Sequence, residues 1–305
     1  MIPDFRSRRT RRAHPFATRH RKQYCGPWQP APPTPLSRRT ATKTILFVVL
    51  SVALLVSILI SAGTGQLGIP PQEVLGSLLH RVGIDWLPLP THPAGDQTLW
   101  AIRFPRVAMA ALVGAGLAVA GLIMQAIFGN PLAEPGVIGI SSGAAVGAGL
   151  AIVFGLTVFG EWTTAVFAFV AGLAATLVVY AMSRAEGKTE VVTLVLTGIA
   201  VNAIAGAAIA LLTFLGDTQS REQIVFWQLG SLAGSRWSQV LIVAPVIAVG
   251  LLVAYGVARK LDLLSLGERN ARHLGVNVEA LRIGMIFIVA LLTGAAVAFA
   301  GIIAF

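Results

Sequence analysis

The 305-residue chain is 55% hydrophobic and only 12% charged, and it carries a formal net charge of +10. Soluble domains have roughly 25% charged residues, and a soluble fold has no way to keep so much apolar surface out of water. The composition therefore excludes a soluble enzyme. It predicts an all-α, polytopic transmembrane protein, because a bilayer core accepts apolar helices.

The positive charge is concentrated near the N-terminus. Eleven of the 23 Lys and Arg precede residue 45, and the others flank apolar segments without interleaved aromatic residues. This distribution indicates membrane topology and contact with anionic lipid headgroups, and it argues against a nucleic-acid partner. Residues 1–44 are basic, contain prolines and have almost no apolar periodicity, so we expect a disordered cytoplasmic tail without an assigned role.

Seven apolar segments are long enough to cross roughly 30 Å of hydrocarbon. None contains Asp, Glu, Lys, Arg or His, and they are residues 45–65, 107–128, 137–159, 162–182, 191–215, 238–257 and 283–304. We therefore expect residues 45–305 to form one transmembrane domain whose charge lies entirely in the connections.

The positions of the charges predict an orientation. With the N-terminus in the cytoplasm, the inner segments 1–44, 183–190 and 258–282 hold 18 of the 23 Lys and Arg, and the outer segments 66–106 and 216–237 hold five. The positive-inside rule favours this topology, although the bias is weak without the N-terminal tail. The outer segment 66–106 is long enough to present a surface to another protein.

The inner segment 258–282 contains a short amphipathic stretch. Its apolar residues recur at helical spacing, and Gly267 and Gly275 bracket it. Such a piece is suited either to lying on the membrane or to docking into a groove of a partner, and the residues themselves leave both open.

The residues offer no chemistry for catalysis or for proton coupling. The predicted spans lack the ionisable side chains of a proton relay, and the single cysteine, Cys25, provides no cysteine metal site. Gly187-Lys188-Thr189 ends like a phosphate-binding loop, but Met182 occupies the position of the required first glycine. We expect no catalytic residue, cofactor or metal, and an energy source that is either another subunit or an existing gradient.

Three glycines recur every four residues in the third predicted span. Gly139, Gly143 and Gly147 are expected to form one smooth helix face that allows close packing of a neighbouring helix. Such a face also leaves room for a substrate path.

Three motifs resemble those of a known family. The stretch 102–150 contains Arg103-Phe104-Pro105-Arg106 and Asn130-Pro131-Leu132-Ala133-Glu134-Pro135-Gly136, followed by Gly139 and Ser141-Ser142-Gly143. Phe226-Trp227-Gln228-Leu229-Gly230-Ser231-Leu232 precedes Trp237, and Leu266-Gly267-Glu268 precedes Ala271-Arg272 and Leu274-Gly275-Val276. Residues 45–305 resemble the FecCD-type permease subunits of bacterial ABC importers for iron–siderophore, haem and cobalamin.

The resemblance implies a permease in the bacterial cytoplasmic membrane that translocates an iron(III)–siderophore complex, with cobalamin or haem as alternative substrates. It implies three partners: an ATP-binding subunit that hydrolyses ATP, a substrate-binding protein, and a second permease subunit that is either a copy or a paralogue. A non-transporting membrane fragment is the alternative from another class.

The resemblance also assigns residues. Arg103 and Arg106 match an arginine pair that receives acidic residues of the binding protein, although both could simply anchor a helix at the headgroups. The ATPase-coupling element is matched by Leu266, Gly267, Glu268, Ala271, Arg272, Leu274 and Gly275. Thr189 and Thr193 match the region of the inner gate. Asn202 is a candidate for the translocation path or, alternatively, for an interhelical hydrogen bond.

The family has about ten helices, and about seven are expected in this chain. The apolar run that ends at Phe305 favours a fragment of a longer product over a subunit that is naturally truncated.

Overall fold

The computed structural model describes residues 36–185 and 188–303, and its contacts divide the chain into two compact units, Met1–Ala53 and Leu54–Phe305. The described part of the first unit is the beginning of helix α1 (Leu36–Gly63), which ends in the second unit. Residues 36–44 were expected to belong to the disordered tail but are helical, because Leu, Arg, Ala and Lys are good helix formers. The remainder of that tail, residues 1–35, lies outside the described residues.

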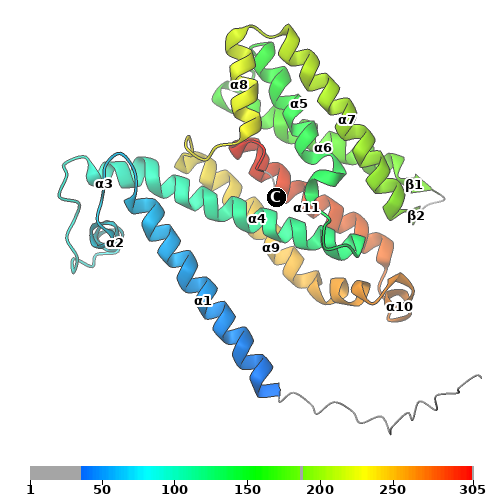
Figure 1. Ribbon diagram of the computed structural model, residues 1–305, viewed down its shortest axis with the longest axis horizontal. Coiled ribbons are helices and arrows are strands. Elements are labelled where there is room, and N and C mark those ends of the chain that lie inside the picture. The colour runs from blue at the N-terminus through cyan, green and yellow to red at the C-terminus, as the bar shows by residue number, and fades with distance from the viewer. Residues whose placement is uncertain (1–35, 186–187, 304–305) are drawn as a thin grey trace, which may run out of the picture. The chain divides into compact units, whose positions relative to one another are not determined.

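The second unit consists mainly of helices, as the all-α prediction requires (Figure 1). The elements are α2 (Pro71–His80), α3 (Gly95–Thr98), α4 (Phe104–Phe128), α5 (Ile140–Val153), α6 (Thr163–Met182), β1 (Arg184–Ala185), β2 (Lys188–Thr189), α7 (Val191–Leu215), α8 (Thr218–Leu229), α9 (Trp237–Ser265), α10 (Glu268–His273) and α11 (Val278–Ala300). A π-helical turn (Leu99–Arg103) joins α3 to α4, and short 3-10 helices (Pro135–Ile138, Gly160–Trp162) precede α5 and α6.

Six helices among the described residues are long and apolar enough to cross a membrane, which confirms a polytopic membrane protein. The third predicted span, residues 137–159, does not form such a helix. α5 has 14 residues, or about 21 Å at 1.5 Å per residue, which is shorter than the hydrocarbon core. Gly139 (φ +79°) and Gly155 (φ +57°) adopt left-handed conformations that end the helix on either side.

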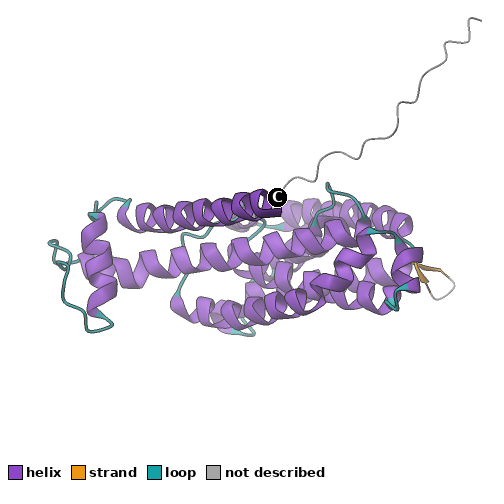
Figure 2. Cartoon of the chain, turned by 90° about the horizontal axis from the view of Figure 1, so that it is seen from below, coloured by secondary structure: helices purple, strands orange, loops and turns teal. Residues whose placement is uncertain are grey.

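Helix α11 is the centre of the second unit. Most of its residues are buried, and it packs against α4, α6 and α9. α5 packs most extensively against α6 and also contacts α7 and α8. The long helices of this unit run in similar directions, so the connecting segments gather at their ends, with β1 and β2 at one end (Figure 2).

The segment between α7 and α9, expected to be an outer connection, contains helix α8. Asp217 caps its N-terminus, and the backbone N–H of Ser220 donates to the Asp217 carboxylate at 2.7 Å. This hydrogen bond lowers the pKa of Asp217. Arg221 in the first turn of α8 donates to the carbonyl oxygen of Gly216 at 2.9 Å, so α8 also covers the end of α7.

Two of the three regularly spaced glycines bring α5 against α6. A Cβ atom at Gly147 would lie 2.2 Å from the carbonyl oxygen of Phe167, and one at Gly143 would lie 2.4 Å from the Cβ of Ala175. Gly139 does not share this face, because α5 begins only at Ile140 and Gly139 has a positive φ. The predicted single face of three glycines is therefore wrong for Gly139.

We expect Gly147→Ala to lower the free energy of unfolding by about 1–3 kcal/mol, because the added methyl group overpacks the contact with backbone of α6. Gly114→Ala in α4 is the matched control, since a Cβ there meets nothing within 4 Å. The control should be neutral or slightly stabilising, because glycine inside a helix is less stable than alanine. Denaturant-induced unfolding in detergent measures both variants. Equal stability of the two would contradict the packing role of Gly147.

Candidate functional site

The predicted coupling element forms helix α10, with Gly267 (φ +98°) before it and Gly275 (φ +83°) after it. Ala271 is fully buried against the core, whereas Leu266 and Leu274 are each 59% exposed. The two leucines lie one on each side of the charged helix, so they could provide apolar contacts to a partner surface. Two exposed leucines thus flank a short helix whose buried residue, Ala271, packs against the core.

Charged residues connect α10 to its surroundings. Glu268 and Arg272 form the i, i+4 ion pair that their spacing predicts, at 3.2 Å. Glu268 also contacts Arg282 of α11. From the sequence, Arg282 and Glu279 were interpreted only as charged residues beside a predicted span. The feature that could have singled them out is their position at the start of an apolar helix.

The predicted gate residues do not form one cluster. Thr189 is buried in β2 and donates to Glu279, whereas Thr193 lies in the first turn of α7 and donates to Glu190 at 3.1 Å. Gly187 lies outside the described residues, and Lys188 and Thr189 form β2, which pairs with β1. Lys188 and Thr189 therefore lie in a strand of a hairpin, whereas a phosphate-binding loop places its Lys and Thr at the end of a glycine-rich loop, the first glycine of which is replaced by Met182 here.

Asn202 lies in the middle of α7 and faces the start of α5. Its side-chain amide donates to the carbonyl oxygen of Gly136 at 3.2 Å and accepts a hydrogen bond from the hydroxyl of Ser142 at 2.6 Å. The alternative interpretation as an interhelical hydrogen bond is thus confirmed. Asn202 also lines a cavity of about 370 Å³ together with Glu134, Ser141 and Ser142. The structure therefore places Ser141 and Ser142 beside Asn202, a proximity that the sequence did not indicate.

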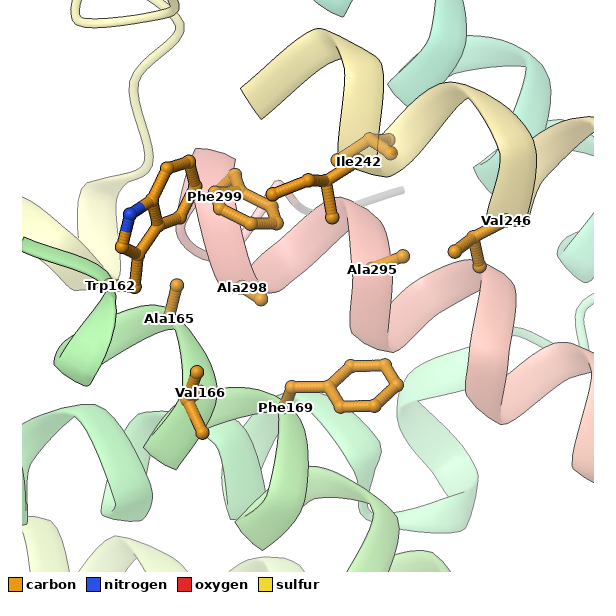
Figure 3. A pocket seen from close by; sticks show the side chains of 10 residues that line it. Trp162, Ala165, Val166, Phe169, Ile242, Val246, Ala295, Ala298 and Phe299 are labelled. Atoms are coloured by element: carbon orange, nitrogen blue, oxygen red, sulfur yellow. The ribbon is translucent and has the colours of Figure 1, made fainter. Parts of the chain in front are cut away.

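A second cavity, of about 320 Å³, lies between α6, α9 and α11 (Figure 3). Aromatic and aliphatic side chains line it, and Trp162 and Phe299 meet edge to face with ring centroids 5.8 Å apart. No charged or hydrogen-bonding side chain other than the Trp162 indole faces it. A charged ligand would lose its hydration there without replacement, so this cavity is unsuited to a polar substrate.

The two arginines predicted to dock the binding protein differ in how far they are exposed to solvent. Arg103 is 7% exposed and donates to the carbonyl oxygens of Ala62 at 2.7 Å, Gly63 at 3.0 Å and Leu67. It therefore holds the last turn of α1 and the following loop, because those carbonyls have no helical partner. Arg106 is exposed. The structure does not present the two as a pair on one surface.

A groove of about 510 Å³ lies beside this region, lined by Arg81, Asp96, Gln97, Trp100, Ala101 and Trp237. The rings of Trp100 and Trp237 stack with centroids 6.2 Å apart, and the Arg81 guanidinium lies 4.6 Å from the centroid of Trp100. Tryptophan and arginine are the residue types that carry most binding energy at protein interfaces.

No group of three His, Cys, Asp or Glu side chains that could hold a metal ion occurs among residues 36–185 and 188–303. The polar groups described above lie instead in the groove at Trp100 and Trp237, around α10, and in the cavity lined by Glu134, Ser141, Ser142 and Asn202.

The chain resembles proteins with named functions. It is 42% identical over 207 residues to the hemin transport system permease protein of Yersinia pestis, covering 67% of this chain and 62% of that protein. It is 40% identical over 205 residues to the cobalamin import system permease protein of Halobacterium salinarum, covering 67% of this chain and 54% of that protein. The chain thus spans less than two thirds of either relative.

A solved structure described as an inward-facing, metal-chelate type ABC transporter matches with a TM-score of 0.72 and 32% identity, covering 86% of this chain and 77% of that chain. The family model of the FecCD transport family matches residues 53–305, which include every described helix after the first part of α1. This protein belongs to the FecCD transport family.

Proposed function

We propose that this chain is the membrane-spanning permease subunit of an ATP-driven importer that carries a metal chelate across the bacterial inner membrane. The observation that carries the proposal is the family match over residues 53–305. The resemblance to a hemin and a cobalamin permease, and to a metal-chelate type transporter, supports the same class of cargo.

A separate ATPase and a substrate-binding protein are the proposed partners. The predicted spans lack ionisable residues, so transport driven by a proton relay within the helices is disfavoured. The exposed leucines on either side of α10, Leu266 and Leu274, provide an apolar contact for the ATPase, with Gly267, Glu268, Ala271, Arg272 and Gly275 shaping and supporting that helix. A second permease copy or paralogue completes the path, to which Asn202, Thr189 and Thr193 contribute.

The proposed orientation places the N-terminus, the 183–190 connection and α10 in the cytoplasm. The excess of Lys and Arg in those segments supports it. The groove at Trp100 and Trp237 then faces the binding protein, with Arg106 at the same end.

The proposed cargo is an iron(III)–siderophore complex, with haem and cobalamin as the alternatives within the same class. All three are bulky, and the cavity lined by Ser141, Ser142 and Asn202 offers neutral hydrogen-bonding groups, with the carboxylate of Glu134 as its one acidic group.

The test is uptake into proteoliposomes that contain this protein together with its proposed ATPase and binding-protein partners. We expect ATP-dependent accumulation of a labelled ferric siderophore. Hemin and cobalamin are assayed in parallel. Accumulation of one of these instead would correct the cargo, and no accumulation of any of the three would favour a non-transporting membrane fragment.

The α10 contact makes a separate prediction. Leu266→Asp or Leu274→Asp should weaken co-purification with the ATPase by about tenfold or more, since a carboxylate would be buried in an apolar contact. Leu89→Asp is the control, because Leu89 is also half-exposed (48%) but belongs to the predicted outer segment. Unchanged ATPase binding in both α10 variants would exclude α10 as the docking element.

Substitutions of Arg106 and of Arg103 should have different measurable effects. Arg106→Glu should slow association of the binding protein and alter the salt dependence of association, as exposed interfacial charges do. Arg103→Met should instead expose residues 62–68 to proteolysis, because the carbonyl groups of Ala62, Gly63 and Leu67 lose the guanidinium donor. Surface plasmon resonance measures the first effect, and limited digestion with the nonspecific protease proteinase K measures the second, since residues 62–68 contain no Lys or Arg for trypsin. Wild-type association kinetics in Arg106→Glu would remove it from the docking surface.

A further inference from the structure

An arginine is buried near the start of helix α11. Arg282 lies one turn after the helix begins at Val278, and only 3% of its side chain is exposed. Removing a guanidinium from water is costly unless ion pairs and hydrogen bonds compensate. The groups that Arg282 contacts therefore indicate its role.

One partner lies in the strand before α7. Nη1 of Arg282 donates to the carbonyl oxygen of Thr189 at 2.7 Å. The backbone N–H and the hydroxyl of Thr189 in turn donate to the carboxylate of Glu279, at 3.2 Å and 2.6 Å. Thr189 is thus held through both of its backbone groups and its side chain. Because α7 begins at Val191, the start of α7 is fixed to the start of α11.

The other partner lies in α10. Nη2 of Arg282 forms an ion pair with Glu268, the first residue of α10, and Nη1 lies 3.7 Å from Glu279. Glu268 divides its carboxylate between Arg282 and the exposed Arg272. The guanidinium therefore bridges α10 and β2, which lie more than seventy residues apart in the chain.

Stability alone does not explain this bridge. Nη1 and Nη2 are both used, yet the buried Nε has no hydrogen-bond partner among the described residues. Replacing a buried ion pair by apolar residues is often neutral or stabilising. What a planar guanidinium adds is a fixed direction for two acceptors at once, so that one cannot shift without the other.

We propose that Arg282 is a positioning residue that transmits displacement of α10 to Thr189 and the first turn of α7. The inference rests on the proposed function, in which a cytoplasmic ATPase acts on α10. Movement of α10 then reaches the membrane-spanning helix α7 through two side-chain contacts, from Glu268 to Arg282 and from Arg282 to Thr189.

The experiment compares uptake per ATP hydrolysed in proteoliposomes of the full complex. Arg282→Met should lower this ratio by about fivefold, within the range found for residues that couple distant sites, while ATP hydrolysis continues. Arg282→Lys should be intermediate, because an ammonium keeps the charge but lacks the planar fork. Arg259→Met, an exposed arginine near the end of α9, should retain the wild-type ratio.

Glu268→Gln provides an independent variant, because it leaves Arg282 in place and removes its ion pair with α10, together with the exposed ion pair between Glu268 and Arg272. It should lower the ratio as well, and Arg282→Met combined with Glu268→Gln should be no worse than Arg282→Met alone, since both break the same connection. If Arg282→Met fails to fold, Glu268→Gln decides the question.

The outcomes separate the two proposals. A wild-type complex that shows no ATP-dependent uptake would overturn the proposed function and the coupling role together. Wild-type uptake with an unchanged ratio in both Arg282→Met and Glu268→Gln would overturn the positioning role alone. A loss of stability in Arg282→Met, together with a wild-type ratio in a stable Glu268→Gln, would also overturn it in favour of a purely structural arginine.

Discussion

Hydrocarbon contains no water, so each peptide group inside a bilayer has to pair within its own helix and each charge has to leave the core or find a partner. In this protein the predicted spans carry no ionisable residue, and charged side chains gather where helices begin and end. The helices consequently approach one another through small residues, as at Gly143 and Gly147.

Two buried arginines show how the ends are organised. Arg103 precedes α4 and collects carbonyl groups at the end of α1, whereas Arg282 near the start of α11 joins α10 to β2. The helices α3 and α10 that adjoin these two sites lie at opposite ends of the pair formed by α4 and α9 (Figure 1). In both places a guanidinium takes several acceptors that the backbone or a helix terminus leaves available, and so fixes a connecting segment to the helical body.

An apolar helical body with charged residues at its ends agrees with membership of a family of membrane transport proteins. The FecCD family match establishes the kind of protein, and its relatives' names differ in the chelate carried. The cavity around Asn202 is lined by Glu134 as well as by Ser141 and Ser142, so it combines neutral hydrogen-bonding groups with one carboxylate.

The sequence by itself determined the helical membrane fold, the approximate positions of the long helices and the short helix between Gly267 and Gly275, because hydropathy and glycine placement are local properties, but it did not place α2 or α3. It predicted α7 at residues 191–215, as observed, but it missed α8 and overestimated the length of α5. Only the tertiary structure decided that Arg103 is buried and Arg106 exposed, that Gly139 lies outside the glycine face, and that Ser142 meets Asn202. The contact between Arg282 and Thr189 likewise joins residues 93 positions apart. Such pairs depend on how helices pack, and a local pattern of residues carries no information about which distant group a side chain will meet.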